Sequence, residues 1–278
     1  MKIYQLTNTT AYQMMGYVIK TNDGHTIVID GGHHNQSDEL YRVLKMVGGH
    51  VDMWFITHLH YDHFGSVIDL FENHDDITVD GFWRNSMRSD FETLNELEQK
   101  EVGEWNEFER KTNIPLHEIT RGDEFTFGDM TISIIEQSRP EIDVNVLNNQ
   151  SAVIKLTDST FSLLILGDLG IEGGRMLLEK DSDKIKADGV QMAHHGQLGV
   201  EKDVYEAIEA KYAFWPTPKW LWDNTRYLGN GTPGSGSFQT PEVIEWMKEL
   251  GTFNVTSFEN TVVFDTDNKE VTPVQKLS

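Results

Sequence analysis

The sequence contains no cysteine, and this absence removes several kinds of chemistry at once. Disulfide bonds, thiolate ligands for zinc and cysteine nucleophiles are all excluded. Any zinc bound by the chain must therefore be held by histidine and carboxylate side chains. The absence of thiols does not indicate in which cellular compartment the protein works, because such a chain is compatible with reducing and with oxidising surroundings.

Long apolar runs are also missing. No stretch is long and apolar enough to cross a bilayer, and residues 1–20 lack the apolar segment of a signal peptide. We therefore expect a cytoplasmic protein without a membrane partner.

Basic side chains are scarce. The 278 residues include 45 acidic and 23 basic side chains, which gives a formal net charge of −22. Such a charge repels polyanions unless a local basic patch overcomes it, and the sequence shows no such patch. We expect the partner to be a small-molecule substrate and not a nucleic acid. The oligomeric state stays open.

One stretch concentrates residues that bind metals. The apolar run Val51–Ile56 predicts a buried strand, and it is followed by His58, His60, Asp62 and His63. In an extended segment His58 and His60 point the same way, as two ligands of one ion must. Asp62 and His63 are expected at a turn that directs them towards a second ion. Surface histidines are the alternative, but four such residues at this spacing favour a metal site.

Other apolar strands also lead into ligand-type residues. Three are predicted: Thr26–Asp30, which ends in Asp30; Phe161–Leu166, which leads to Asp168; and Asp188–Ala193, which leads to His194 and His195. A carboxylate at the end of an apolar strand is costly to bury unless a positive charge meets it, and metal ions would do so. Asp168 could instead cap the following helix. His194 and His195 point in different directions, so both could bind, one to each ion.

Together these segments resemble the metallo-β-lactamase superfamily. Its motifs occur here in the family's order: DGG at 30–32, HxHxDH at 58–63, NNQS at 148–151, GD at 167–168 and HHG at 194–196. The resemblance covers about residues 1–265. The NNQS and HHG motifs are similar to the branch that includes phosphorylcholine esterases and the metallo-hydrolase domain of bacterial DNA-uptake proteins.

The resemblance implies two divalent metal ions. The implied ligands are His58 and His60 for the first ion, Asp62 and His63 for the second, Asp168 between the two, and His194, His195 or both to complete the shells. His195 is favoured for the second ion. Asp30 would orient the ligand loop without binding a metal. These nitrogen and oxygen donors suit zinc and also admit manganese or iron.

The implied fold class is α/β, an αββα sandwich of two mixed β-sheets with helices on the outer faces and the site at one edge. We expect one domain over residues 1–278, and a helix over Ser66–Phe71 that the chain enters at Gly65. Residues 88–111 predict a helical insertion with a break at Gly103, which either covers the pocket or forms an ordinary outer helix. Residues 215–238 predict an aromatic, glycine-rich loop.

The sequence departs from the superfamily pattern in two places. Many members have a further histidine ligand near Asn149, but this chain has no histidine between His117 and His194. Gln239 stands where related sequences often have a histidine before a proline. Because of both departures, the function of this chain can differ from that of the superfamily branch that it resembles.

Four residues are candidates for substrate binding. Asn148 and Asn149 could donate to a substrate oxyanion or simply cap a strand. Trp220 and Trp222 could form a cage for a quaternary ammonium group through cation–π attraction. They could equally form a hydrophobic cluster or a subunit contact.

The resulting hypothesis is a dinuclear metal-dependent hydrolase, and the resemblance favours a phosphodiesterase that acts on a small or choline-like substrate. Two ions bridged by Asp168 would lower the pKa of a shared water and give a hydroxide nucleophile, which Asp62 could help to orient. One alternative is hydrolysis of a carbonyl substrate such as a lactone, thioester or β-lactam. The other is a binding module that uses the fold without turnover.

Overall fold

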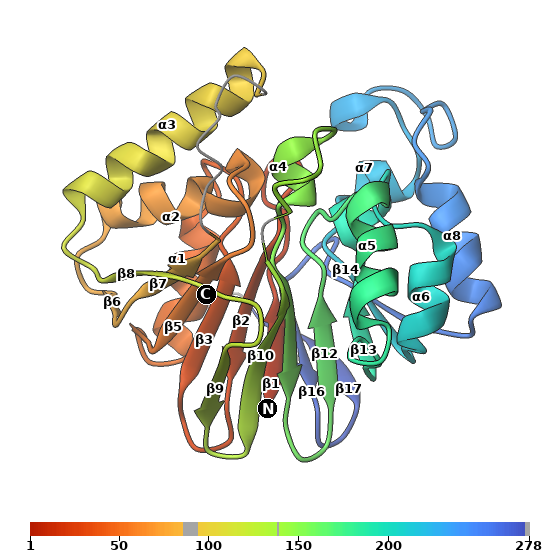
Figure 1. Ribbon diagram of the computed structural model, residues 1–278. Coiled ribbons are helices and arrows are strands. Elements are labelled where there is room, and N and C mark those ends of the chain that lie inside the picture. The colour runs from red at the N-terminus through yellow and green to blue at the C-terminus, as the bar shows by residue number, and fades with distance from the viewer. Residues whose placement is uncertain (86–93, 138, 276–278) are drawn as a thin grey trace.

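The computed structural model describes residues 1–85, 94–137 and 139–275. Two large mixed β-sheets pack face to face, and helices cover their outer faces (Figure 1). This arrangement is the predicted αββα sandwich.

Strands far apart in the sequence meet in the first sheet. Its spatial order is β17 (Glu270–Pro273), β16 (Val262–Asp265), β1 (Lys2–Gln5), β2 (Gly16–Lys20), β3 (Thr26–Asp30), β5 (Met53–Ile56), β7 (Phe82–Arg84) and β8 (Leu116–Glu118). The strands from β17 to β3 pair antiparallel, and those from β3 to β8 pair parallel. β4 (His50–Val51) and β6 (Thr78–Val79) form a separate short parallel pair.

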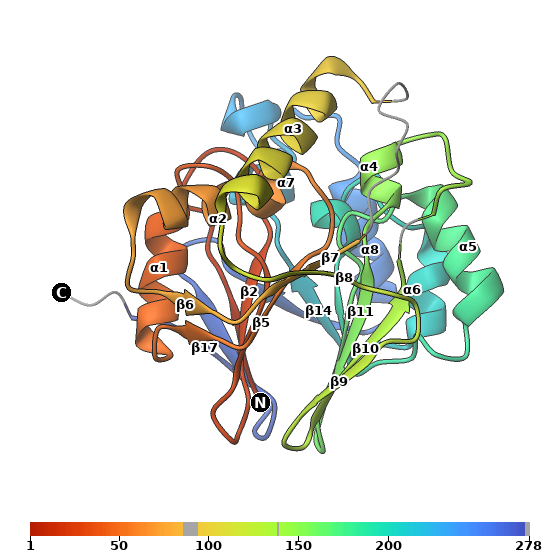
Figure 2. The ribbon, with the colours of Figure 1, turned by 60° about the vertical axis from the view of Figure 1, so that its left-hand side comes forward.

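The second sheet is also mixed. Its spatial order is β15 (Phe253–Thr256), β14 (Tyr212–Trp215), β13 (Gly189–Gln191), β12 (Ser162–Ile165), β11 (Val153–Thr157), β10 (Met130–Glu136) and β9 (Glu124–Phe127). β9 to β12 pair antiparallel, and β12 to β15 pair parallel. Figure 2 shows the two sheets diverging towards the end where the helices α3, α4 and α7 lie.

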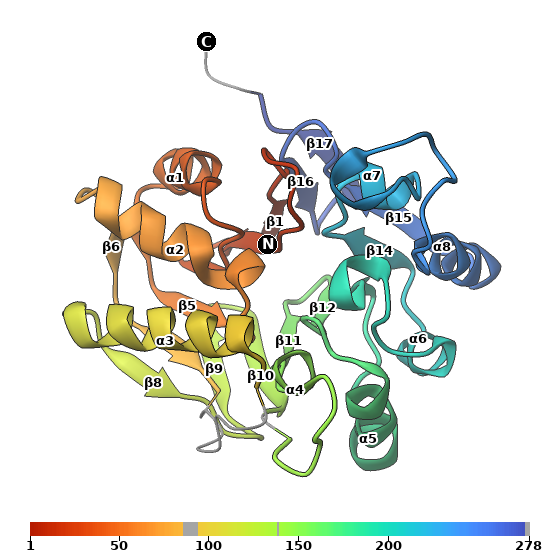
Figure 3. The ribbon, with the colours of Figure 1, turned by 90° about the horizontal axis from the view of Figure 1, so that it is seen from above.

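Helices lie on both sides of the sandwich (Figure 3). On the first sheet these are α1 (Ser37–Met46), α2 (Tyr61–Asn73) and α3 (Glu96–Lys111); on the second they are α5 (Ile171–Asp181), α6 (Lys202–Ile208) and α8 (Thr240–Glu249). Shorter turns are α4 (Val146–Asn149), α7 (Lys219–Trp222) and the 3₁₀ segments η2 (Ala193–Gly196) and η3 (Tyr227–Gly229). The described part of the chain contains no helix with the length and apolar character that a membrane crossing requires.

The strand before the metal motif contributes to two apolar cores. Met53 and Phe55 of β5 face the core between the sheets, whereas Trp54 and Ile56 face the core beneath α1, α2 and α3. All four side chains are at most 2% exposed. A strand covered on both faces reads as an uninterrupted apolar run, which is the pattern that the sequence shows here.

The helix after the metal motif begins earlier than predicted. α2 starts at Tyr61, so Asp62 and His63 lie in its first turn and not at a separate turn before Ser66. The negative charge of Asp62 suits the positive end of the helix dipole. Gly65 lies inside α2, where an added Cβ would come within 2.5 Å of the backbone nitrogen of His34. Gly65 therefore permits close packing and does not mark the helix start.

The predicted insertion is one unbroken helix over its described part. α3 continues through Gly103, so the predicted break is wrong, and residues 88–93 lie outside the described residues. Asn95 caps α3 by accepting from the backbone of Leu97 and Glu98, and the Glu98 carboxylate accepts from the backbone of Asn95.

One other segment contains more regular structure than predicted. The aromatic, glycine-rich loop predicted at 215–238 includes α7 and η3.

Candidate metal centre

The predicted ligands lie where strands of both sheets end. Asp30 is the last residue of β3. His58 follows β5, Asp168 follows β12 and His195 follows β13. Carboxyl ends of neighbouring parallel strands lie at the same edge of a sheet, where functional sites commonly form. A backbone hydrogen bond of 3.0 Å from Ala152 to Thr57 joins the two sheets at this edge.

Among the described residues, three groups of side chains have the composition of metal sites, and two of them contain predicted ligands; the third is His50, Asp52 and Asp80. The first consists of His58, His60 and Asp168, and the second of Asp62, His63, Asp168 and His195. Within each group, one ligand atom from every residue lies within 4.8 Å of the others. Asp168 belongs to both groups, which is the position that a bridging ligand must have.

Asp30 fixes the orientation of His63. Its Oδ2 lies 2.7 Å from Nδ1 of His63, and its carboxylate also accepts from the backbone and hydroxyl of Thr57, each at 2.7 Å. Burial raises the pKa of Asp30, while the neighbouring His63 and the Thr57 donors oppose this shift. With Nδ1 donating to Asp30, Nε2 of His63 is the nitrogen that can bind a metal.

Two buried polar atoms at the centre lack a hydrogen-bond partner among the described residues. Nε2 of His63 and Oδ1 of Asp168 lie 3.2 Å apart, and neither has a hydrogen-bond partner within the described ranges. Buried polar atoms are nearly always satisfied in proteins. A divalent cation between them would satisfy both, so these residues fit a metal ion.

His195 is oriented by the chain that follows β14. Its Nδ1 lies 2.8 Å from the carbonyl oxygen of Pro216, to which it can donate. Its Nε2 then points to Asp62 Oδ2 at 3.0 Å and Asp168 Oδ2 at 3.3 Å. The predicted preference of His195 for the second ion agrees with this geometry and stays a prediction.

The first group is built around two facing imidazoles. Nε2 of His58 lies 3.0 Å from Nδ1 of His60. Nδ1 of His58 contacts the hydroxyls of Thr57 at 3.2 Å and Ser151 at 3.3 Å. The same Ser151 oxygen accepts from the backbone nitrogen of Asp168 at 2.9 Å. Ser151 therefore positions one residue from each sheet.

The carboxylate and imidazole charges in the centre are strongly coupled. Burial raises the pKa of Asp168, but the charges of His195 and His63 outweigh it and hold the pKa well below its usual range. Burial lowers the pKa of His63, but Asp168 and Asp30 raise it well above normal. Protons on the imidazoles thus balance the buried carboxylates, and a divalent cation could replace those protons.

Comparisons with known proteins agree with this geometry. Residues 12–79, which include Asp30 and the HxHxDH motif, match the model of the metallo-β-lactamase superfamily. Over this part the chain is similar to the metallo-β-lactamase superfamily. Among curated proteins, none matches its sequence.

Solved structures share the fold of this chain. The metallo-β-lactamase fold protein YhfI from Bacillus subtilis is 12% identical, with a TM-score of 0.58 over 95% of this chain and 99% of that one. CmlA, a diiron β-hydroxylase from Streptomyces venezuelae, is 10% identical, with a TM-score of 0.54 over 98% of this chain and 54% of that one. Identities this low establish the shared fold alone.

One predicted ligand lies at the margin of the centre. Among the described residues, His194 belongs to neither group, although its Nε2 is 3.9 Å from Asp168 Oδ2. Both His194 and His195 have left-handed backbone conformations, with φ of 49° and 55°, which separate their side chains. His33 and His34 also lie outside both groups: His33 stacks on Tyr12, and His34 pairs with Asp69.

The two asparagines have different surroundings. Oδ1 of Asn149 accepts from the backbone of Gly170 and Gly173, and its Nδ2 donates to Val144, so it anchors the start of α5. These contacts with α5 differ from the predicted strand cap, and the role of Asn149 as an oxyanion donor stays a prediction. Asn148 donates to Asn145, and its Oδ1 is buried without a partner in the described part of the chain.

The two tryptophans also differ. Trp222 packs edge-on against Trp215 and Phe258, at ring distances of 5.0 and 5.3 Å, which makes it part of a hydrophobic cluster. Trp220 donates to the carbonyl of Ala11 and contacts Tyr227 edge-on. Neither residue belongs to the first or the second metal-ligand group.

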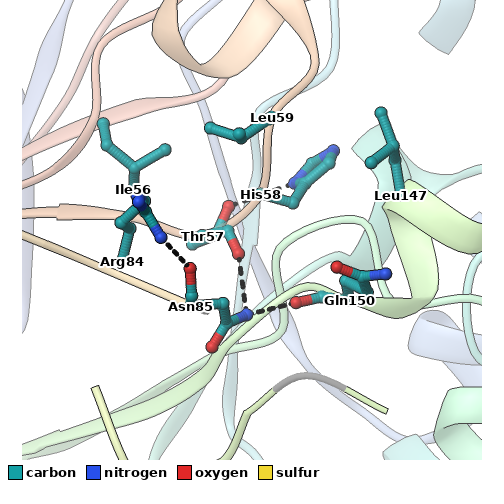
Figure 4. Close-up of a pocket in the computed structure, with 8 residues that line it drawn as sticks. All are labelled: Ile56, Thr57, His58, Leu59, Arg84, Asn85, Leu147 and Gln150. Atoms are coloured by element: carbon teal, nitrogen blue, oxygen red, sulfur yellow. Dashed lines mark hydrogen bonds between the residues drawn. The ribbon is translucent and has the colours of Figure 1, made fainter. Parts of the chain in front are cut away.

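A residue that the sequence analysis missed joins the two sheets behind His58 (Figure 4). Nδ2 of Asn85 donates to the carbonyl oxygens of Gln150 and Thr57. The cavity at this point has a volume of only about 10 Å³, so it cannot hold a substrate. No local pattern marks Asn85, because it acts through partners distant in the sequence.

Proposed function

We propose that this chain is a dinuclear metal-dependent phosphodiesterase for a small substrate. The observation that carries the proposal is Asp168, which is shared by two groups of imidazole and carboxylate donors. The first ion would be held by His58, His60 and Asp168, and the second by Asp62, His63, Asp168 and His195. All donors are nitrogen or oxygen, so zinc is our first choice, and manganese or iron would also fit.

The mechanism that we propose needs no protein nucleophile. The chain has no cysteine, and the hydroxyl of Ser151 is buried and already accepts from Asp168. When bound, two divalent ions supply a water of lowered pKa and neutralise charge on phosphoryl oxygens. Asp62 is the most exposed member of the second group, with 21% of its side chain accessible, so it can orient an incoming water or ester.

The surroundings of His60 support a substrate with a cationic end. Glu98 and Glu101 lie within 4.0 Å of its Nε2, and Glu104 accepts from the hydroxyl of the adjacent Tyr61. Among these carboxylates Glu104, with 34% of its side chain exposed, would attract a cation such as the ammonium of a choline-like ester. The NNQS and HHG motifs, through the branch that they resemble, favour the phosphodiester over a carbonyl group.

Turnover of chromogenic esters tests the proposal. The zinc-loaded protein and Asp168→Ala should be assayed with bis-p-nitrophenyl phosphate, p-nitrophenyl phosphorylcholine, a chromogenic β-lactam and a p-nitrophenyl carboxylic ester. We expect turnover of at least one phosphodiester, abolished in the variant. Turnover of only the carbonyl substrates would replace the proposal with its carbonyl alternative. A metal-loaded protein inactive on all four would contradict the proposal.

A further inference from the structure

We propose that Glu101, assisted by Glu98, positions His60 for the first metal ion. The inference rests on the proposed metal centre. It gives α3 a function in the site, because both carboxylates come from this helix. Glu98 and Glu101 are positioning residues here, since they act through His60 and need not touch substrate.

The two ring nitrogens of His60 face different partners. Its Nδ1 lies 3.0 Å from Nε2 of His58, on the side of the first group. Its Nε2 lies 3.9 Å from Oε1 of Glu98 and 4.0 Å from Oε2 of Glu101. If Nδ1 binds the ion, Nε2 carries the hydrogen and points at two carboxylates.

Glu101 has a buried oxygen that needs a donor. The residue is only 5% exposed, and its Oε1 accepts from the backbone nitrogen of Tyr61 at 3.2 Å. Its Oε2 has no hydrogen-bond partner in the described parts of the chain. A buried carboxylate oxygen without a partner is costly, and the hydrogen on Nε2 of His60 would satisfy it after a small movement.

Glu98 is held in place by the start of α3. Its Oε2 accepts from the backbone nitrogen of Asn95 at 2.8 Å as part of the capping box. This bond leaves Oε1 directed towards His60. The signal that caps the helix therefore also orients a carboxylate at the centre.

The carboxylates of Glu98 and Glu101 lie beside the first ligand group, which is the smaller of the two that contain Asp168. The first group contains three residues, whereas the second contains four, and the chain lacks the histidine that many family members have near Asn149. A carboxylate that accepts from the outer nitrogen of a ligand histidine fixes its tautomer and makes it a better donor. We infer that α3 strengthens the first site in this way.

Metal titration of three variants tests the inference without relying on turnover. Glu101→Gln and the double variant Glu98→Gln with Glu101→Gln should be compared with Glu107→Gln, a control on the same helix whose exposed carboxylate pairs with Lys111. Zinc affinities are measured by competition with a chromophoric chelator, and cobalt-loaded proteins are compared by visible absorption.

We expect Glu101→Gln to weaken one of the two ions by about 10- to 100-fold and to change the cobalt spectrum, while the other ion keeps its affinity. The double variant should be weaker still, and Glu107→Gln should match the wild type. Unchanged affinities and spectra in Glu101→Gln would overturn the inference, even if the variant unfolds at a lower temperature. Wild-type protein that binds two ions without phosphodiester turnover would contradict the proposed function alone.

Discussion

Nε2 of His63 and Oδ1 of Asp168 face each other at 3.2 Å, although His63 lies in α2 and Asp168 follows β12 of the second sheet. Both side chains are almost fully buried, at 0% and 2% exposure. The other ring nitrogen of His63 is occupied by Asp30 at 2.7 Å. The fold therefore directs one ring nitrogen and one carboxylate oxygen at the same point, and a divalent cation there would replace the imidazole proton.

Asp30→Asn should weaken the second ion. The amide cannot accept from both His63 and Thr57 as the carboxylate does, so the orientation of His63 would be lost. We expect a loss of about 10- to 100-fold in the affinity of one ion and of about 1–3 kcal/mol in the free energy of unfolding. Chelator competition and urea unfolding measure the two effects.

Asp69→Asn provides a matched control for this variant. Asp69 accepts from Nδ1 of His34 at 2.8 Å and from the backbone of Asn35 at 2.6 Å, in the same pattern as Asp30. It lies outside the first and the second ligand group. Equal losses of metal affinity in Asp30→Asn and Asp69→Asn would show that Asp30 has no special role.

Metal binding should release protons near neutral pH. Burial lowers the pKa of His195, but the charge of Asp168 and the bonds to Asp168 and Asp62 raise it to about 10 in the metal-free protein. His195 is then protonated at neutral pH and must lose this proton before Nε2 can bind an ion. The apparent affinity should rise as pH increases towards about 10.

Calorimetric zinc titrations in buffers of different ionisation enthalpy measure the released protons. A heat of binding that does not depend on the buffer would contradict this prediction. In the metal-free protein, the raised pKa also stabilises the fold below the ordinary pKa of histidine. That contribution is lost as pH rises through about 10.

Gly196→Ala should destabilise the turn after the paired histidines. Gly196 has φ of +80°, and an added Cβ would lie 2.5 Å from Cζ3 of Trp215. Gly251 has a similar φ of +72° but open space around it. We expect Gly196→Ala to cost about 1–3 kcal/mol more than Gly251→Ala in urea unfolding of the metal-free proteins. Similar costs would show that backbone conformation alone matters at Gly196.

The ligand positions could be predicted because their signals are local. Each apolar strand is followed at once by a histidine or aspartate, as in β5 before His58 and β12 before Asp168. The αββα sandwich could then be predicted because the motifs occur in the order of the family that they resemble. The start of α2 was misplaced because His60 makes no side-chain capping bond, so no capping residue marks the first turn.

Contacts between distant segments could not be predicted. Ser151 lies 93 positions from His58 in the sequence, and Glu101 lies 40 positions from the Tyr61 backbone that it accepts from. Such pairs depend on how the two sheets and α3 pack. A single sequence does not show this packing, and for the same reason the contacts of Asn149 with the start of α5 were not predicted.

Zinc content per chain tests the central claim most directly. Wild-type protein and Asp168→Ala should be stripped of metal, reloaded with zinc, freed of excess and measured by elemental analysis together with protein concentration. Because Asp168 belongs to both ligand groups, we predict about two zinc ions per wild-type chain and loss of both in the variant. A folded wild-type chain that retains no zinc, or a variant that retains as much as the wild type, would contradict the account.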